Sequence, residues 1–295
     1  MKILIAVDGS RASDAALQEV ISRPWPKESA FSLVTAVDPF FFVRAPLLLE
    51  EAKKSTNQEL EEDAAGLRAK GWPVNSGVLL ENPRHAIPKV ATEWKADLIV
   101  LGSHGRGAFT RLLIGSTAQA VLRHAPCSME IVRTPREDRA SPGVRGMRIL
   151  IPTDGSEYAV LAVNQVAERP WPEGTIFKVV ACPEYPVLVG EYPYYAPEQL
   201  VELTKASEAQ AKAAVEAAAA VLRNSGHDVR TEVTEPRDSP ARTILSSADL
   251  WQADLIVMGS HGRRGFDRLV MGSVSESVAM HAHCSVAVVR QCLIL

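Results

Sequence analysis

Aromatic residues are few in this chain, and neither sign of charge prevails. Aromatic side chains make up 6% of the 295 residues, and 32 Lys and Arg stand against 35 Asp and Glu, for a formal net charge of −3. Proteins that bind nucleic acids usually present a basic surface to the phosphates, and single-strand binders add aromatic side chains that stack on bases. We therefore expect no nucleic-acid partner.

Long apolar runs are also missing. The apolar segment at 3–7 ends at Asp8-Gly9. A transmembrane helix needs about 20 apolar residues, and a signal peptide needs a longer apolar region with a small-residue cleavage site. We expect no membrane partner and a cytoplasmic location.

Cysteine is scarce. Cys127, Cys182, Cys284 and Cys292 include no C-x-x-C pair, so the sequence indicates neither a zinc site nor a redox motif. Cys127 and Cys284 stand just before apolar segments, where buried cysteines act as small hydrophobic residues.

The chain contains two copies of one pattern. Residues 2–10, Lys-Ile-Leu-Ile-Ala-Val-Asp-Gly-Ser, return 146 positions later as Arg-Ile-Leu-Ile-Pro-Thr-Asp-Gly-Ser at 148–156. Gly-Ser-His-Gly-Arg at 102–106 returns at 259–263, 157 positions later. The change of offset indicates about 11 extra residues in the second copy, mostly between its second and third strands. Two copies with a period near 150 indicate a duplicated domain.

We predict a first domain at 1–135, a linker at 136–146 and a second domain at 147–295. The linker is polar, carries Pro and Gly and has no apolar periodicity. Apolar strands alternate with helical segments in each copy, which predicts an α/β fold with an open, doubly wound, mostly parallel sheet. In the first copy the expected strands are residues 3–7, 31–37, 74–80, 98–101 and 129–132.

A glycine-rich segment follows the fourth predicted strand of each copy. In the first copy, Gly102-x-x-Gly105 is followed by nine residues and then by Gly115-Ser116. Glycine permits positive φ and close approach of the backbone, so consecutive N–H groups can converge on an anion. The helix that begins at Ser116 adds unpaired amides and the positive end of its dipole, which favour phosphate. The second copy repeats the spacing with Gly259, Gly262, Gly272 and Ser273.

Asp8 and Asp154 end the first strand of each copy. In a sheet whose first and fourth strands are neighbours, they would flank the same crevice as the glycine-rich segments. A carboxylate there can accept from a ribose hydroxyl or hold Mg²⁺ through water. Each feature alone is also ordinary turn or helix-cap chemistry, but the recurrence of the whole pattern favours a nucleotide site.

The Asp-Gly-Ser strand end and the G-x-x-G-(nine residues)-G-S loop resemble the universal stress protein family, in its ATP-binding branch. The resemblance covers essentially the whole chain, twice. It implies two tandem five-stranded parallel sheets of strand order 3-2-1-4-5, an adenine-nucleotide alpha-hydrolase-like fold. It implies ATP as the ligand, with cyclic AMP as an alternative. The residues that we expect at the ligand are Asp8, Gly9, Val37, Gly102, Gly105, Arg106, Gly115, Ser116, Thr117, Asp154, Gly155, Gly259, Gly262, Arg263, Gly272, Ser273 and Val274.

Some of these positions leave alternatives open. The resemblance places Val37 beside adenine, but Pro183 stands at that position in the second copy and lacks an N–H for a backbone contact. The second site is therefore expected to bind differently or not at all. Arg106 and Arg263 either neutralise phosphate charge or are solvated. The loop histidines have no visible orienting partner for catalysis, and we expect a structural or phosphate-flanking role for them.

The resemblance also implies that the last strands of the two copies pair with each other, and that two chains form a homodimer. Apolar segments at 39–43, 47–49 and 186–195 follow the second strands. They either cover the nucleotide, pack between the domains or pack against another chain.

We expect an ATP-binding stress-response or signalling protein with little or no hydrolysis. A P-loop lysine, an arginine finger and a water-activating base are not evident, so an ATPase would be slow. The alternatives are such a slow ATPase and an interaction scaffold without nucleotide.

Overall fold

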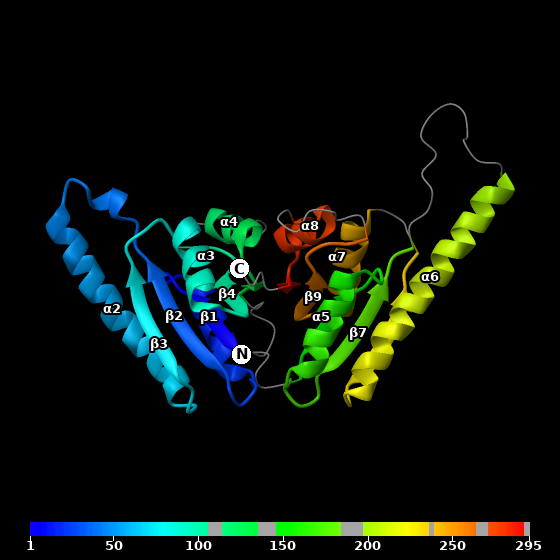
Figure 1. Cartoon of the computed structure of the whole chain (residues 1–295), viewed down its shortest axis with the longest axis horizontal. Helices are drawn as coiled ribbons and strands as arrows, with labels where there is room; N and C mark the ends of the chain where they lie inside the picture. Colours follow the sequence, from blue (N-terminus) through cyan, green and yellow to red (C-terminus); the bar gives the residue numbers. More distant parts are fainter. Residues whose placement is uncertain (106–113, 135–145, 184–196, 236–238, 264–270, 292–295) are drawn as a thin grey trace.

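The computed structural model describes residues 1–105, 114–134, 146–183, 197–235, 239–263 and 271–291 (Figure 1). The predicted alternation of strands and helices is confirmed in both halves. The elements of the first half are β1 (Lys2–Ala6), α1 (Arg11–Ser22), β2 (Ala30–Ala36), the 3-10 helix η1 (Pro39–Phe42), α2 (Pro46–Arg68), β3 (Val74–Leu79), α3 (Pro83–Trp94), β4 (Leu98–Gly102), α4 (Ser116–His124) and β5 (Ser128–Val132). Those of the second half are β6 (Arg148–Pro152), α5 (Glu157–Glu168), β7 (Ile176–Ala181), α6 (Pro197–Asn224), β8 (Asp228–Val233), α7 (Pro240–Trp251), β9 (Leu255–Gly259), α8 (Ser273–His281) and β10 (Ser285–Val289).

All ten strands form one sheet. Their order is β3-β2-β1-β4-β5-β10-β9-β6-β7-β8, so each half has the order 3-2-1-4-5 that the resemblance implied. Neighbours within a half are parallel, and helices cover both faces of the sheet. In Figure 1, α2 and α6 lie at the two outer flanks, whereas α4 and α8 face each other near the centre.

Local sequence explains where the helices begin and end. Ser10 caps α1 in a reciprocal capping box, in which the Ser13 amide donates to Ser10 Oγ and the Ser10 amide donates to Ser13 Oγ. Gly71 and Gly226 follow α2 and α6 with φ of +82° and +84°, a backbone conformation that glycine adopts without steric cost. Each of the two helices is therefore followed closely by a glycine that lets the chain turn away.

The two halves meet at a seam between β5 and β10, the only antiparallel pair among the strand pairs of the described residues. Glu130 stands opposite Ala287, and Met129 stands opposite Val288. Both strands are buried along their whole length. The expected pairing of the last strands between the domains is confirmed, and it protects two apolar edges that would otherwise be free to associate.

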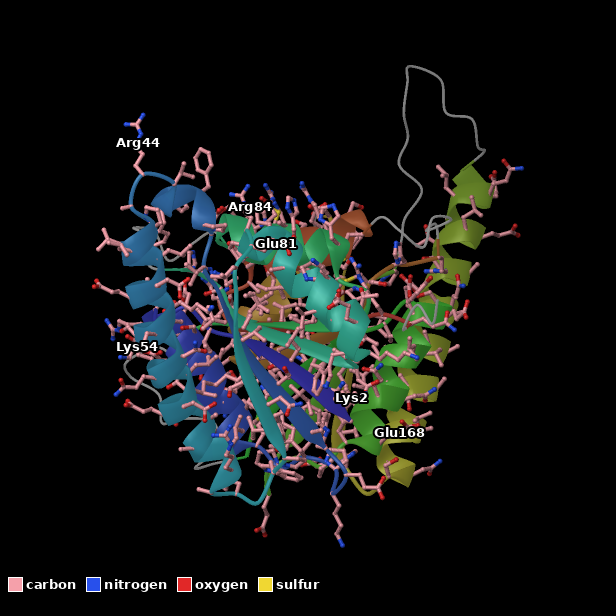
Figure 2. The ribbon with its side chains drawn as sticks, turned by 60° about the vertical axis from the view of Figure 1, so that its left-hand side comes forward. Lys2, Arg44, Lys54, Glu81, Arg84 and Glu168 are labelled. Carbon is pink, nitrogen blue, oxygen red and sulfur yellow. The ribbon has the colours of Figure 1, made fainter. Side chains whose placement is uncertain are left out.

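The apolar segment after β2 does not lie between the domains. Phe40 is 78% exposed and Phe41 is 81% exposed, and Val43 and Leu47 are also open to solvent. Figure 2 shows Arg44 pointing away from the body of the molecule beside the start of α2. The described residues therefore do not bury the side chains of Phe40, Phe41, Val43 and Leu47. The predicted segment at 186–195 and nearly all of the predicted linker lie outside the described residues.

In the described part of the chain, no helix combines the length and the apolar character that crossing a membrane requires.

Candidate functional site

The strand order brings the predicted site residues of each half to one place. Since β1 and β4 are neighbours, Asp8 after β1 and Gly102 at the end of β4 flank the point where the strand order reverses. Ligands in open α/β sheets bind outside the carboxyl ends of strands at this point. In the second half, β6 and β9 bring Asp154 and Gly259 together in the same way.

The first glycine of each loop is required by close packing against a helix. A Cβ atom on Gly102 would lie 2.5 Å from the backbone carbonyl carbon of Ala12 in α1. A Cβ on Gly259 would lie 2.6 Å from the same atom of Tyr158 in α5. Glycine at these two positions therefore lets the strand end reach the helix, whether or not a ligand is present.

The second glycine packs against the aspartate. A Cβ on Gly105 would lie 2.7 Å from Asp8 Oδ2, and a Cβ on Gly262 would lie 2.8 Å from Asp154 Oδ2. The aspartate also organises the backbone of both halves, because Asp8 Oδ1 accepts from the Ser10 amide at 3.0 Å and Asp154 Oδ1 accepts from the Ser156 amide at 2.9 Å. In the second half, Asp154 Oδ2 also accepts from the Arg263 amide at 3.0 Å. The aspartate thus joins the first strand to the loop.

A metal ion would find few protein ligands here. The described residues contain no group of three or more His, Cys, Asp or Glu side chains that could hold a metal. Mg²⁺ takes most of its ligands from water and substrate phosphates, so one carboxylate such as Asp8 or Asp154 suits only an ion that arrives with a nucleotide.

The amino ends of α4 and α8 are the parts of each candidate site with uncapped backbone amides. Gly115 and Gly272 are the N-cap residues, and neither helix has a hydrogen bond from a capping side chain. The Gly115 amide donates to Ser103 O at 2.7 Å and the Gly272 amide to Ser260 O at 2.9 Å, so these two amides are already used. Within the described residues, the amides of 116–118 and 273–275 donate to no protein acceptor. These first-turn amides are the groups that can hold phosphate.

The loop histidines have a structural role. His104 Nδ1 lies 3.0 Å from Ser103 Oγ, and Ser10 Oγ donates to the carbonyl of His104 at 3.0 Å. Burial, and then the positive charge of Arg133, lower the pKa of His104. A neutral imidazole supplies no charge to a phosphate, so His104 ties the loop to the start of α1. His261 makes the matching contacts with Ser260 and Ser156.

At the expected adenine position, the backbone amide is already hydrogen-bonded within the sheet. The Val37 amide donates to Leu79 O at 2.8 Å and so continues the pairing of β2 with β3. It is therefore not free to contact a base. The missing N–H of Pro183, which is buried, removes a hydrogen bond of the sheet and not a contact to the ligand.

A second proline makes the two sites unequal, and the sequence reasoning missed it. Pro152 stands at the end of β6 where the first half has Ala6. The ladder between β1 and β4 runs to Ala6↔Leu101, whereas the ladder between β6 and β9 stops at Leu150↔Ile256. Proline has no N–H to donate, so the hydrogen-bonded ladder ends earlier at the second site. The signal is present in the sequence, because alignment of residues 2–10 with residues 148–156 places Pro152 at the position of Ala6.

The remaining predicted residues lie at the starts of α4 and α8, in the turns after β1 and β6, or in the loops. Ser116 and Ser273 are exposed at the first helical position, Thr117 and Val274 follow them half-buried, and Gly9 and Gly155 have positive φ in the turns after β1 and β6. Arg263 is exposed at the edge of its loop. Arg106 lies outside the described residues.

Comparison with known proteins agrees with this architecture. The sequence profile of the Universal stress protein family matches residues 1–133 and again residues 147–290. A universal stress protein of Mycobacterium tuberculosis is 27% identical over 314 residues, which cover 99% of this chain and 97% of that protein. One of Mycolicibacterium smegmatis is 28% identical over 301 residues, covering 98% and 96%. The crystal structure of a universal stress protein from Archaeoglobus fulgidus superposes with a TM-score of 0.65 at 19% identity and covers 99% of this chain and 97% of that one. The chain therefore belongs to the universal stress protein family and carries two copies of its domain in tandem.

Proposed function

We propose that the protein binds ATP in each half, with the phosphates at the amino ends of α4 and α8, and acts as a stress-response or signalling module. One observation carries the proposal: at the point where the strand order reverses, the first-turn amides of both helices have neither a capping side chain nor, among the described residues, a protein acceptor. Such amides, together with the helix dipole, bind phosphate groups.

The two sites are expected to differ in affinity. The first half has a complete β1–β4 ladder beside its site, and the second half has Pro152 at the corresponding strand end. We propose the first site as the tighter one, because its strand end is fixed by the neighbouring strand before the ligand binds.

Little or no hydrolysis is expected. The histidines are held by serine hydroxyls and backbone, and the carboxylate of Asp154 accepts from two backbone amides. These groups are poorly placed to activate a water molecule. Slow ATP hydrolysis remains the alternative activity, and a homodimer and a cytoplasmic location stay predictions.

The direct experiment is to purify the protein without added nucleotide, denature it and identify any released ligand by mass. Released ATP, or calorimetric binding of ATP at one or two sites, supports the proposal. Binding of cyclic AMP in place of ATP would change the proposed ligand but not the proposed site. Recovery of ADP together with measurable phosphate release would indicate a slow ATPase. Failure to bind any adenine nucleotide would favour an interaction scaffold that works without nucleotide.

A pair of substitutions separates binding from folding. Ser116→Asp and Ser273→Asp place a negative charge at the first helical position, where it favours the helix by about 0.3–1 kcal/mol but repels phosphate. We expect unchanged or higher thermal stability and a loss of ATP affinity of at least about tenfold. The uncharged Ser116→Asn with Ser273→Asn is the matched control and should retain binding. Equal affinity of the Asp and Asn variants would place the phosphates elsewhere.

A further inference from the structure

The seam between the halves is nearly symmetric in backbone but not in charge. The repeat offsets make Glu19 equivalent to Gln165, Arg23 to Arg169 and Glu130 to Ala287. Glu130 and Ala287 also stand directly opposite each other in the β5–β10 pair. The pseudo-twofold axis that relates the halves therefore passes through a position that holds one carboxylate and one methyl group.

A cluster of charges is buried around this axis. Arg23 Nη1 donates to Glu130 Oε2 at 3.0 Å, and its other terminal nitrogen lies 2.8 Å from Glu130 Oε1. Arg23 also pairs with Glu19, one turn earlier on α1. The Glu130 side chain is only 1% exposed. The second half contributes Trp171, whose ring centroid lies 5.9 Å from the Arg23 guanidinium carbon, so both halves enclose the cluster.

The second half supplies a second cation. Arg169 Nη2 donates to Gln165 Oε1 at 3.1 Å, which repeats the Arg23–Glu19 contact with a neutral partner. The charge of Glu130 acts on Arg169 as well as on Arg23. The cluster thus holds two carboxylates, both from the first half, and two guanidinium groups, one from each half. The charge of Asp97, also from the first half, acts on Arg169 as well.

We infer that these residues select the pairing of a first domain with a second domain and disfavour the pairing of two like domains from different chains. Within this cluster, only the unlike pairing gives equal numbers of carboxylates and guanidinium groups. This concerns which surfaces join at the seam and is independent of nucleotide binding.

The pairing of two first domains would bring too many carboxylates together. Two copies of Glu130 would face each other on the axis, and with two copies of Glu19 there would be four carboxylates for two Arg23 side chains. Burial, and to a lesser extent Glu130, already raise the pKa of Glu19 to about 7 although Arg23 opposes this. A further pair of buried carboxylates would therefore be unpaired or protonated.

The pairing of two second domains would have the opposite defect. Two Arg169 side chains would meet around two Ala287 methyl groups, with Gln165 as their only partner from the same cluster. Loss of hydration upon burial already lowers the pKa of Arg169. Each Arg169 would then lack the charge of Glu130 that acts on it now, and a buried guanidinium group that loses a carboxylate partner is unfavourable.

A separate contact across the seam carries the same preference. Arg123 at the end of α4 pairs with Glu276 in α8 at 2.7 Å, and the equivalent pair on the other side of the axis is Gln119 with Met280. Two first domains would set Arg123 against Gln119, and two second domains would set Met280 against Glu276. An ion pair forms only between unlike domains.

Two substitutions give the intact chain the axial charges that a pairing of two first domains or of two second domains would have. Ala287→Glu puts two carboxylates on the axis, as two first domains would, and Glu130→Ala leaves none, as two second domains would. We expect each to speed amide hydrogen exchange in β5 and β10 at pH 8 by at least about tenfold, since each unbalances buried charge. Glu130→Ala combined with Ala287→Glu moves the carboxylate across the axis toward Arg169 and should return exchange to within about threefold of the original rate.

The cycle distinguishes charge selection from ordinary packing. If exchange in the combined variant is as fast as the product of the two single effects, the inference is wrong, because independent packing defects add. Glu130→Gln keeps the volume and removes the charge. It should speed exchange nearly as much as Glu130→Ala, and an exchange rate equal to that of the original chain would overturn the inference.

Discussion

Arg133 and Arg290 occupy the same position in the two halves, and each closes the last helix of the other half. Arg290 Nη1 donates to Ala125 O and Nη2 to Leu122 O, both at 2.7 Å, at the carboxyl end of α4. Arg133 Nη2 donates to Met280 O at 3.0 Å at the end of α8. A cation at this end of a helix satisfies unpaired carbonyls and interacts favourably with the dipole. The two domains therefore exchange helix caps.

Substitution of Arg290 should loosen the seam. Arg290→Met keeps the apolar length of the side chain but removes two charge-assisted hydrogen bonds, and we expect a loss of about 2–3 kcal/mol in the free energy of unfolding. Urea denaturation together with hydrogen exchange of the α4 end would measure it. Arg230→Met, at an exposed position of β8, is the matched control and should change the stability by less than about 0.5 kcal/mol. Equal stability of the two variants would show that the exchanged caps contribute nothing.

The contribution of Glu19 to the stability of the protein should fall as the pH rises from about 4.5 to about 7. Burial raises the pKa of Glu19 from 4.5 to about 7, with Arg23, Glu130 and Ser285 as the groups that face it. Between these values the folded chain binds more protons than the unfolded chain, so deprotonation favours unfolding. The expected decrease from this group is on the order of 1–3 kcal/mol.

Two variants test whether Glu19 causes this pH dependence of stability. Glu19→Gln cannot titrate and should flatten the slope of unfolding free energy against pH in this range. Glu93→Gln, at an exposed position of α3, should leave the slope as it is. A slope that persists in Glu19→Gln would mean that another group releases the proton.

Restoration of an N–H at the end of β6 should extend the second ladder. Pro152→Ala gives the second half the residue that Ala6 supplies in the first, and the new amide should donate to β9 and exchange slowly with solvent. Hydrogen exchange resolved to residue 152 measures this directly, with the Ala6 amide as the internal reference. An unprotected amide at 152 would show that the ladder ends early for another reason. If the ladder extends, the affinities of the two nucleotide sites should also become more alike.

The first loop glycine should be more important for folding than for binding. Gly102→Ala places a Cβ 2.5 Å from the backbone of Ala12, so α1 must shift, and we expect a loss of about 1–3 kcal/mol in stability. Gly77→Ala is the matched control, because a Cβ there meets nothing within 4 Å. Thermal unfolding of both variants without nucleotide separates the two cases. A Gly102→Ala protein that is fully stable but does not bind ATP would indicate a direct ligand role for this position.

Much of each half was predictable from the residues alone. The apolar runs at 3–7 and 98–101 are local signals, and each forms a strand where it was expected. The cap at Ser10 and the glycine after α2 are local features of the same kind. The repeated loop spacing marked the candidate site residues in each half. The expected strand order, in which the first and fourth strands are neighbours, then placed Asp8 beside Gly102. These features follow from hydrophobic periodicity and backbone geometry, which act over a few residues.

The properties of the seam and of the site edges depend on residues that are far apart in the sequence. The use of the Val37 amide depends on β3, the early end of the second ladder depends on β9, and the charge balance depends on Glu19, Arg23 and Glu130 meeting the second half. The sequence by itself determined a duplicated α/β fold with mostly parallel strands. Only the tertiary structure decided which amides remain open to a phosphate and which charges are buried, because both depend on the neighbours that a group acquires when the chain folds.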